Sequence, residues 1–388
     1  MGAIRPLIRA ARDGAIFAGV GGVRTIEGVQ RGYRAAEHHR RAGSVRPLEA
    51  AGLRAGWRQG AARPHFEASY PPKHWKWTEI EPLALQSAEL VKPGPEAQRR
   101  TLGLSNPAAR GATHTLSGAV QVVMPGEIAP SHRHTAAAIR FIIKGSGTIT
   151  MVNGEPCPMS PGDLVLTPGW TWHGHVNQGD GPMIWMDSLD LPLVNFLRGM
   201  RQEEYPDELN PATVGVGNSE ARYGNGFLQP AWEQPASPIS PLLTFPWSKT
   251  EQALHELARH GSSPFDDVAF RYTNPSTGGH VLPTIGCWIQ MLRPGVHTHA
   301  HRHTTSAVYH VFRGRGSTIV DGVRIDWEQG DFLSLPPWSW HEHVNRSGSE
   351  DAVLFSTTDA PVIEAINLFV AEPFEEGDGH QAVTASYA

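Results

Sequence analysis

Short apolar runs separated by turn residues dominate the chain from about residue 118 onward. They are four to seven residues long, include many β-branched side chains, and lie at residues 118–124, 139–143, 148–152, 164–167 and 183–186. Asn153-Gly154 follows one run, and this dipeptide is the strongest short signal for a two-residue β-hairpin turn. Many short strands with regular turns predict an all-β sandwich or barrel.

The pattern occurs twice. Landmarks of the first half return in the same order in the second half, which predicts a tandem duplication of a whole domain. The pairs are 106–107 (NP) with 274–275 (NP), 145–147 (GSG) with 314–316 (GRG), 153–154 (NG) with 321–322 (DG), 162–163 (GD) with 330–331 (GD), and 170–173 (WTWH) with 338–341 (WSWH).

Two segments carry helical signals. Residues 74–77 (HWKW) lead into a pattern that predicts a helix ending at Leu90. Residues 248–251 (SKTE) have the spacing of a capping box, which predicts a helix from there to about His260. Residues 201–247 are rich in Pro, Gly and Asn and indicate the connection between two domains.

Residues 1–68 differ from the rest, with twelve Arg, no Lys and few apolar clusters. Disorder or loose helix is one interpretation and a targeting leader is another, although acidic residues are also present. A DNA-binding arm fits less well because no helix-turn-helix pattern accompanies it. We expect this segment to contribute little to the core, and we predict a first β domain at residues 69–230 and a second at 231–388.

Composition narrows the class of protein. The chain has 388 residues, of which 40% are hydrophobic and 18% charged, and a formal net charge of −5. The charge argues against a dedicated nucleic-acid or membrane-surface binder. No apolar run approaches the ~18 residues that a membrane span needs. Cys157 and Cys287 give neither a disulfide framework nor a thiolate zinc site, so we predict a cytoplasmic protein.

Histidine supplies the candidate chemistry. In each copy a Gly is followed after five residues by His-Arg-His and later by a third histidine. Alternate residues of a strand share a face, so each His-x-His pair points one way and an adjacent strand can complete the set. Three imidazoles suit a divalent transition metal and leave coordination positions open. The sets are His132, His134 and His173 in the first copy, and His301, His303 and His341 in the second.

These motifs resemble the cupin superfamily, whose second motif ends in an Asn four residues after the histidine, here Asn177 and Asn345. The resemblance implies tandem cupin barrels, of the double-stranded β-helix or jelly-roll type, with a few peripheral helices. Many cupins add a glutamate ligand after the His pair, but residues 136–139 and 305–308 hold no acid. An all-histidine set leaves a more positive Fe(II) centre, which can accept an anionic chelating substrate and still bind O₂.

Longer stretches resemble one branch of two-cupin enzymes, the gentisate 1,2-dioxygenase family, with relatives that cleave salicylate and 1-hydroxy-2-naphthoate. The likeness runs from about residue 74 to 369. It implies a non-haem Fe(II) in the first cupin and a homotetramer. The stretches that carry it are residues 99–107 (RRTLGLSNP), 130–135 (PSHRHT), 140–141 (RF), 168–170 (PGW) and 173–175 (HGH).

The resemblance assigns roles by position. The three histidines of the first copy would hold the iron. Arg99 and Arg140 would bind the substrate carboxylate, a task that suits a planar guanidinium. His175 would hydrogen bond to the ring hydroxyl or bound oxygen, and Asp187 would orient that histidine. Arg140 could instead be a buried arginine with an acidic partner, and His175 could be a surface histidine.

The implied reaction is Fe(II)-dependent cleavage of gentisate by O₂ to maleylpyruvate. Ser117 or a neighbour stands where salicylate-cleaving members carry a Trp, which favours gentisate. Cleavage of 1-hydroxy-2-naphthoate or salicylate is the alternative within the family. A non-catalytic two-cupin binding protein would not need six ligand histidines, and a metal-dependent isomerase would usually have the missing glutamate.

The second copy keeps its histidines but changes their surroundings. Tyr309 replaces Arg140 and Ser356 replaces Asp187, whereas the histidine two residues after the third ligand is retained as His343. Metal binding is expected there, but binding of an aromatic carboxylate is not, because the arginine is absent. We therefore predict a structural or vestigial metal site in the second domain.

Overall fold

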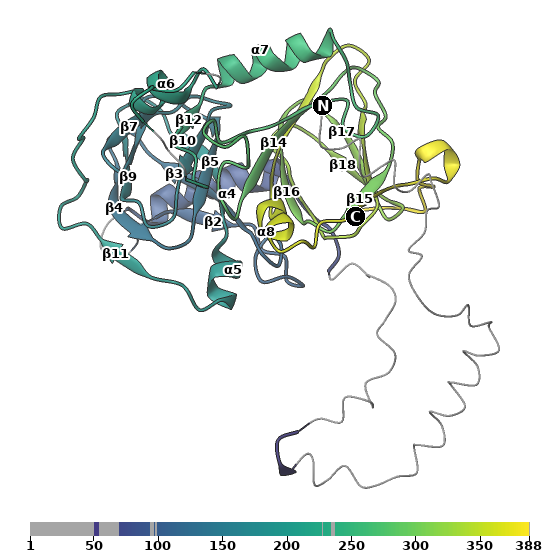
Figure 1. Ribbon diagram of the computed structural model, residues 1–388, viewed down its shortest axis with the longest axis horizontal. Helices are drawn as coiled ribbons and strands as arrows, with labels where there is room; N and C mark the ends of the chain where they lie inside the picture. Colours follow the sequence, from purple (N-terminus) through teal and green to yellow (C-terminus); the bar gives the residue numbers. More distant parts are fainter. Residues whose placement is uncertain are drawn as a thin grey trace. The chain divides into compact units, whose positions relative to one another are not determined.

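Four mainly antiparallel sheets form two barrels (Figure 1). The strands of the first barrel are β2 (Thr101–Gly103), β3 (Ser117–Val123), β4 (Ile128–His134), β5 (Ala138–Lys144), β6 (Thr148–Val152), β7 (Glu155–Pro158), β8 (Leu164–Thr167), β9 (His173–Asn177), β10 (Met183–Leu189), β11 (Gln202–Glu204) and β12 (Thr244–Phe245). They form two sheets, in the orders β12-β8-β5-β10-β3-β2 and β11-β4-β9-β6-β7.

The second barrel repeats this plan. Its strands are β1 (Lys73–Trp75), β13 (Val268–Arg271), β14 (Gly286–Leu292), β15 (His301–His303), β16 (Ala307–Arg313), β17 (Gly316–Val320), β18 (Val323–Trp327), β19 (Phe332–Leu335), β20 (His341–Asn345), β21 (Ala352–Thr358), β22 (Ala371–Pro373) and β23 (Ala385–Ser386). The sheet orders are β1-β19-β16-β21-β14-β13 and β22-β15-β20-β17-β18-β23. The predicted all-β fold of two tandem barrels is confirmed.

The computed structural model describes residues 50–53, 70–93, 97, 99–226, 228–233 and 237–387. The chain divides into two units, Met1–His65 and Phe66–Ala388, and both barrels belong to the second. Most of residues 1–68 lie outside the described residues, so what we expect of that segment stays a prediction, as do the domain boundaries. None of the described helices combines the length and apolar character needed to cross a bilayer.

The helices lie between and around the strands. They are α4 (Trp77–Leu90), α5 (Leu191–Phe196), α6 (Asn218–Tyr223), α7 (Trp247–Ala258), α8 (Ala360–Ala365) and the 3₁₀ turn η3 (Gly377–Gly379). The predicted helix ending at Leu90 is confirmed as α4. The predicted connection at residues 201–247 also contributes β11, α6 and β12, so it packs on the first barrel as well as linking the two.

The predicted hairpin at Asn153-Gly154 is confirmed between β6 and β7. Both residues have positive φ, 47° and 89°, as a type I′ turn requires. Asp321 and Gly322 repeat the turn in the second barrel, with φ of 47° and 80°. The duplication therefore extends to backbone conformation, not only to residue type.

The barrels exchange short segments. β1 precedes the first barrel in sequence but pairs with β19 of the second, whereas β12 pairs with β8 of the first. Helix α4 follows β1 and begins beside the second barrel, and helix α7 follows β12 and begins beside the first. Trp77 N donates to Asp331 Oδ1 and Trp247 N donates to Asp163 Oδ1, both at 2.8 Å. Each Gly-Asp landmark thus caps a helix from a distant part of the chain.

The capping-box prediction for residues 248–251 is wrong about how this helix begins. α7 begins at Trp247, after Pro246 in extended conformation, and its N-terminus has no side-chain cap from its own sequence. Ser248 therefore lies inside the first turn. The carboxylate of Asp163 takes the place of the local cap, and a negative charge at a helix N-terminus is favourable. Gly162 has φ of +87° and packs against the Trp247 ring, so a side chain there would clash.

A shared core lies between the barrels. Phe141 on β5 stacks on Phe355 of β21 with ring centroids 4.0 Å apart, and both belong to one apolar cluster drawn from the two barrels. Ser188 and Thr357 hydrogen bond across the same interface at 3.0 Å. Since side chains alternate along a strand, Arg140, next to Phe141, faces the interior of the first barrel.

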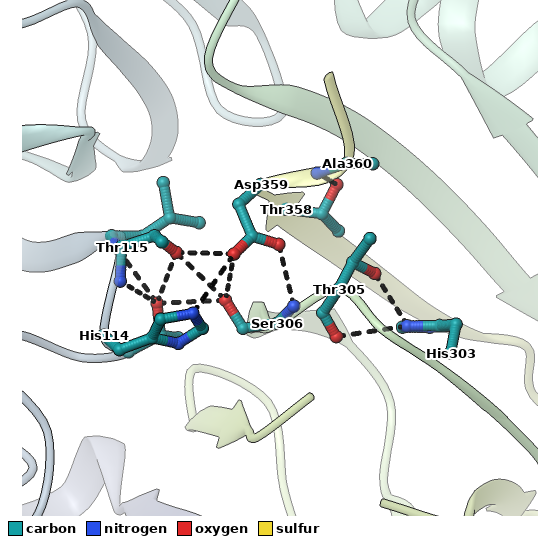
Figure 2. A network of polar contacts seen from close by, with 10 residues as sticks. His114, Thr115, His303, Thr305, Ser306, Thr358, Asp359 and Ala360 are labelled. Atoms are coloured by element: carbon teal, nitrogen blue, oxygen red, sulfur yellow. Dashed lines mark hydrogen bonds and ion pairs between the residues drawn. The ribbon is translucent and has the colours of Figure 1, made fainter. Parts of the chain in front are cut away.

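A buried polar network joins the barrels beside this core (Figure 2). Thr115 Oγ1 donates to Asp359 Oδ2 at 2.6 Å, and Ser306 N donates to Asp359 Oδ1 at 2.8 Å. Asp359 is fully buried, so these donors offset the cost of removing its charge from water. The residue before Ser306 is Thr305, which contacts His303 of the second histidine set (Figure 2).

The helix caps between barrels generate a stability prediction. Asp331→Ala removes the acceptor of Trp77 N and of His74 Nε2, which lies 2.8 Å from Asp331 Oδ2. We expect a loss of about 1–3 kcal/mol in the free energy of unfolding, measured by denaturant titration, because buried donors lose their partner. Asp326→Ala, at a partly exposed ion pair on β18, is the control and should change stability by less than about 0.5 kcal/mol. Equal stability of the two variants would contradict the capping role.

Candidate active site

Three imidazoles from two neighbouring strands meet inside the first barrel. His132 on β4 lies opposite His173 on β9, and His134 is two residues along the same face of β4. All three are buried, and each offers a nitrogen within 4.8 Å of those of the other two. The ring centroids of His132 and His173 are 4.6 Å apart. The structure therefore brings together the three histidines that the motif spacing singled out.

Backbone carbonyl oxygens orient two of these rings. Nδ1 of His134 donates to the Ala136 oxygen at 2.8 Å, and Nδ1 of His173 donates to the Thr171 oxygen at 2.9 Å. Because a carbonyl only accepts, the proton lies on Nδ1 and Nε2 keeps a lone pair. Nε2 of His173 is buried and makes no hydrogen bond within the described residues. This donor set fits a divalent transition-metal ion.

Burial keeps the imidazoles neutral. It lowers the pKa of His132 to about 2, with the charge of Arg99 adding to the effect, and it also lowers the pKa of His134. The pKa of His173 lies well below its usual value, chiefly because the ring is buried. Since neutral imidazole is the form that binds metal, these ligands need lose no proton at neutral pH.

Arg140 and Asp187 face each other across β5 and β10. They are partners in the strand register, with Arg140 Nε 3.4 Å from Asp187 Oδ1. Arg140 Nη1 also donates to Thr167 Oγ1. Burial raises the pKa of Asp187, and the charge of Arg140 opposes that shift. The arginine is thus buried, has an acidic partner, and belongs to the barrel interior that holds the histidines.

The expected contact between Asp187 and His175 is wrong. His175 Nδ1 hydrogen bonds to Thr150 Oγ1 at 2.9 Å, because the two residues are register partners on β6 and β9. Asp187 instead accepts from Trp185 Nε1 at 3.0 Å and pairs with Arg140. His175 is fully buried rather than at the surface, and its Nε2 has no hydrogen-bond partner among the described residues.

Arg99 connects the two strands that carry the histidines. Its Nη1 donates to the Pro130 oxygen on β4 at 2.9 Å, and its Nη2 lies 3.4 Å from the His173 oxygen on β9. Burial and the nearby charge of Arg140 lower the pKa of Arg99 to about 9, which still leaves it charged at neutral pH. The charges of Arg99 and Arg140 thus both act on the neutral imidazoles of the first histidine set.

Three polar neighbours escaped the sequence analysis: Thr150, Thr167 and Trp185. Each lies at an inward position of its strand and fixes one of the predicted residues. Alternation alone could have marked Thr150 and Thr167 as inward polar positions on apolar strands. Their partners depend on which strands pair and in which register, and a single sequence does not contain that information.

The second barrel builds its histidine set in the same way. His301 lies opposite His341 in the register, and the three ligand nitrogens lie within 4.8 Å of one another. Nδ1 of His303 is 2.6 Å from Thr305 Oγ1, as Figure 2 shows, and Nδ1 of His341 donates to the Ser339 oxygen at 2.9 Å. This donor set also fits a transition metal.

The surroundings of the second set are uncharged where the first set has its ion pair. Tyr309 faces Ser356 at the register positions of Arg140 and Asp187. The Tyr309 ring lies 5.3 Å from that of His343, and burial raises the pKa of its hydroxyl, which keeps it neutral. Trp327 fills the adjacent interior and donates to Thr318 Oγ1 at 3.0 Å. The second barrel thus repeats the ligands without the positive charge.

Comparison with known proteins gives a consistent result. A family model described as cupin domain matches residues 119–189 and again 288–358. The 5-aminosalicylate 1,2-dioxygenase of Comamonas sp is 38% identical over 333 residues, which cover 82% of this chain and 86% of the relative. The gentisate 1,2-dioxygenase of Streptomyces sp is 38% identical over 320 residues, 80% of this chain and 86% of the relative.

A solved structure extends the likeness to three dimensions. The salicylate 1,2-dioxygenase from Pseudoaminobacter salicylatoxidans, crystallised as an adduct with gentisate, matches with a TM-score of 0.78 and 32% identity. The match covers 92% of this chain and 96% of that one. The two-barrel arrangement is therefore shared along nearly the whole length of both proteins.

The ligand assignment predicts separable metal sites. His132→Ala should lose the metal of the first barrel and His301→Ala that of the second, because each removes one of three neutral donors. His175→Ala is the matched control, since it removes a buried imidazole that lies outside the ligand set, and it should retain wild-type metal content. Metal per chain can be measured by elemental analysis after anaerobic Fe(II) loading. Loss of metal from His175→Ala, or none from His132→Ala, would contradict the assignment.

Proposed function

This chain belongs to the gentisate 1,2-dioxygenase family of two-cupin ring-cleaving dioxygenases, and we propose that it cleaves gentisate to maleylpyruvate in its first barrel, with Fe(II) and O₂. The observation that carries the proposal is the position of Arg140. Its buried guanidinium lies in the same barrel interior as the neutral imidazoles of the first histidine set, and its charge helps to lower the pKa of His173. A planar charged donor beside a metal site suits the carboxylate of an aromatic acid.

The metal would be held by His132, His134 and His173. When bound, iron supplies the redox chemistry by which an electron-rich ring and O₂ react side by side. The protein's own contribution is binding and orientation. Arg140 binds the substrate carboxylate, and its guanidinium is held in place by Thr167 and Asp187. Such a fixed, charged donor lowers the entropic cost of placing the ring for reaction.

His175 is proposed to hydrogen bond to a substrate oxygen. Its Nδ1 is engaged by Thr150, so Nε2 is the nitrogen that remains for a ligand. Burial lowers the pKa of His175 well below its usual value, so the neutral ring can donate or accept a hydrogen bond at one nitrogen without adding charge. Asp187 is a positioning residue for Arg140 in this scheme rather than a partner of His175.

Gentisate is preferred over other ring acids on two grounds. Its second hydroxyl makes the ring electron-rich, and Ser117 or a neighbour on β3 stands where salicylate-cleaving members carry a Trp. The amino group of 5-aminosalicylate, the substrate in the name of one relative, occupies the same ring position as that hydroxyl. This compound is therefore the sharpest competitor to test. We also propose Fe(II) as the native metal, a homotetramer as the assembly and the cytoplasm as the location.

The substrate proposal is tested with a panel under single-turnover and steady-state conditions. Anaerobically Fe(II)-loaded protein should consume O₂ with gentisate and form an ultraviolet-absorbing ring-opened product. We expect kcat/KM for gentisate to exceed the values for 5-aminosalicylate, salicylate and 1-hydroxy-2-naphthoate. The His301→Ala/His303→Ala variant should retain most of this activity per first-barrel iron, since the second barrel lacks the arginine. A higher kcat/KM for any other compound would reassign the substrate and leave the ring-cleaving activity in place.

The carboxylate clamp makes a quantitative prediction. Arg140→Ala should lower kcat/KM for gentisate by a factor that corresponds to a loss of about 2–4 kcal/mol in transition-state stabilisation. The reason is that a charged hydrogen bond is lost in a buried site. Arg140→Lys keeps the charge but not the planar fork, so it should cost less. Arg133→Ala is the control, since Arg133 stacks on Trp170 at the outer face of β4. Unchanged kinetics in both Arg140 variants would remove this residue from the site.

A further inference from the structure

A second kind of metal-type cluster lies outside both barrel interiors. Glu342 on β20 stands between His341 and His343, whose side chains face the barrel interior. Its own side chain therefore points to the opposite, outer face of the strand. There it meets His297, from the loop before β15, and His380, which follows η3 near the end of the chain. One donor atom from each of the three side chains lies within 4.8 Å of the other two.

The two histidines converge on the same carboxylate oxygen. His380 Nδ1 is 3.1 Å from Glu342 Oε2, and His297 Nε2 is 3.4 Å from it. The two imidazole rings are tilted by 37° to each other, with centroids 4.1 Å apart. The other oxygen, Glu342 Oε1, accepts the Gln381 backbone N–H at 3.0 Å, which fixes the orientation of the carboxylate. Oε2 and the two ring nitrogens therefore form a preorganised donor set.

Among the described residues, no arginine or lysine pairs with Glu342. The side chain is fully buried, and its ion-pair contacts within the described residues are the two histidines alone. Burying an ionised carboxylate is costly unless a cation or several donors accompany it. His297 and His380 are partly exposed, with side-chain exposures of 39% and 31%, so the cluster is reachable from solvent. A cation from solution would complete the balance.

The duplicated barrel supplies an internal control. Gly174 stands at the position of Glu342, and Ile128 at that of His297. Ser131 N donates to the Glu208 oxygen just as Ala300 N donates to the Gly379 oxygen, which makes Leu209 the counterpart of His380. In the first barrel this outer face has no room for a side chain at Gly174, where Ser131 and Leu209 pack closely. The barrel therefore folds without the three polar residues.

We propose that His297, Glu342 and His380 form a Zn²⁺ site on the outer face of the second barrel. Two imidazoles and one carboxylate are a ligand set that zinc takes in proteins, with a further position left to water. The set differs from the all-histidine interior sites by its carboxylate and its exposure. The proposal does not depend on the substrate of the first barrel, and its test can fail while ring cleavage is retained.

The site would fasten the C-terminal segment to the barrel. Glu342 belongs to the central strand β20, whereas His380 belongs to the segment that leads to β23 at the sheet edge. Gln381 holds the same segment through its side chain, which donates to the Ile319 oxygen and accepts from Gly322 N. A metal ion that binds only the folded arrangement stabilises it by linkage. Zinc should thus raise the melting temperature.

Zinc stoichiometry of the full-length protein tests the proposal. At micromolar free Zn²⁺, wild type should bind one equivalent more than Glu342→Gln, His380→Ala or His297→Ala, as measured by elemental analysis after removal of free metal. Zn²⁺ should raise the melting temperature of wild type by several degrees more than that of each variant. Glu342→Gln preserves shape, and His297 is partly exposed, so these two variants are expected to fold. Gentisate turnover of the iron-loaded variants should equal that of wild type.

His260→Ala is the matched control for adventitious binding. His260 lies 3.0 Å from Glu256 on the protein surface, and the described residues supply no third donor to this exposed His–Glu pair. The His260→Ala protein should bind as much Zn²⁺ as wild type. Equal zinc content in wild type and Glu342→Gln, or the same loss in His260→Ala, would overturn the proposal. A wild-type melting temperature that does not respond to Zn²⁺ would overturn it as well.

Discussion

Strand register is the constraint on which the candidate active site depends. In the first barrel three register pairs place His132 opposite His173, Thr150 opposite His175, and Arg140 opposite Asp187. Each pair spans two antiparallel strands with side chains on the inner face. A slip by one residue in any of these strands would turn its polar residues outward and disassemble the site. The apolar core between the barrels opposes such a slip because it fixes the opposite faces of β5 and β10.

The two barrels share one fold but differ in the side chains that would bind substrate or metal. Backbone carbonyl oxygens orient two histidines in each barrel: those of Ala136 and Thr171 in the first, and those of Thr305, 3.2 Å from His303 Nδ1, and Ser339 in the second. The orientation of the ligands therefore belongs to the shared fold. The charged pair of the first barrel becomes Tyr309 and Ser356 in the second, which keeps the volume filled and removes the charge. On the outer face the change runs the other way, from Gly174 to Glu342. The proposed substrate site and the proposed outer zinc site thus both depend on polar residues that one barrel has and the other lacks.

The sequence predicted what local pattern and spacing encode. Strand positions, the hairpin at Asn153-Gly154 and the three-histidine sets required only alternation and repeat spacing. The ion pair of Asp187 with Arg140 and the cap of α7 were mispredicted because in each case the partner comes from a segment distant in sequence. The carboxylate of Asp163, 84 residues from Trp247, replaces the local capping box. The outer cluster was missed for the same reason, since His297, Glu342 and His380 share no motif.

We propose that the first barrel binds an aromatic carboxylate at its metal through Arg140, while the second barrel holds metal alone. A crystal structure of the Fe(II)-loaded protein with gentisate under anaerobic conditions tests this directly. We expect gentisate in the first barrel only, with its carboxylate against the Arg140 guanidinium and its ring beside His132, His134 and His173. Gentisate in the second barrel near Tyr309, or a carboxylate turned away from Arg140, would contradict it.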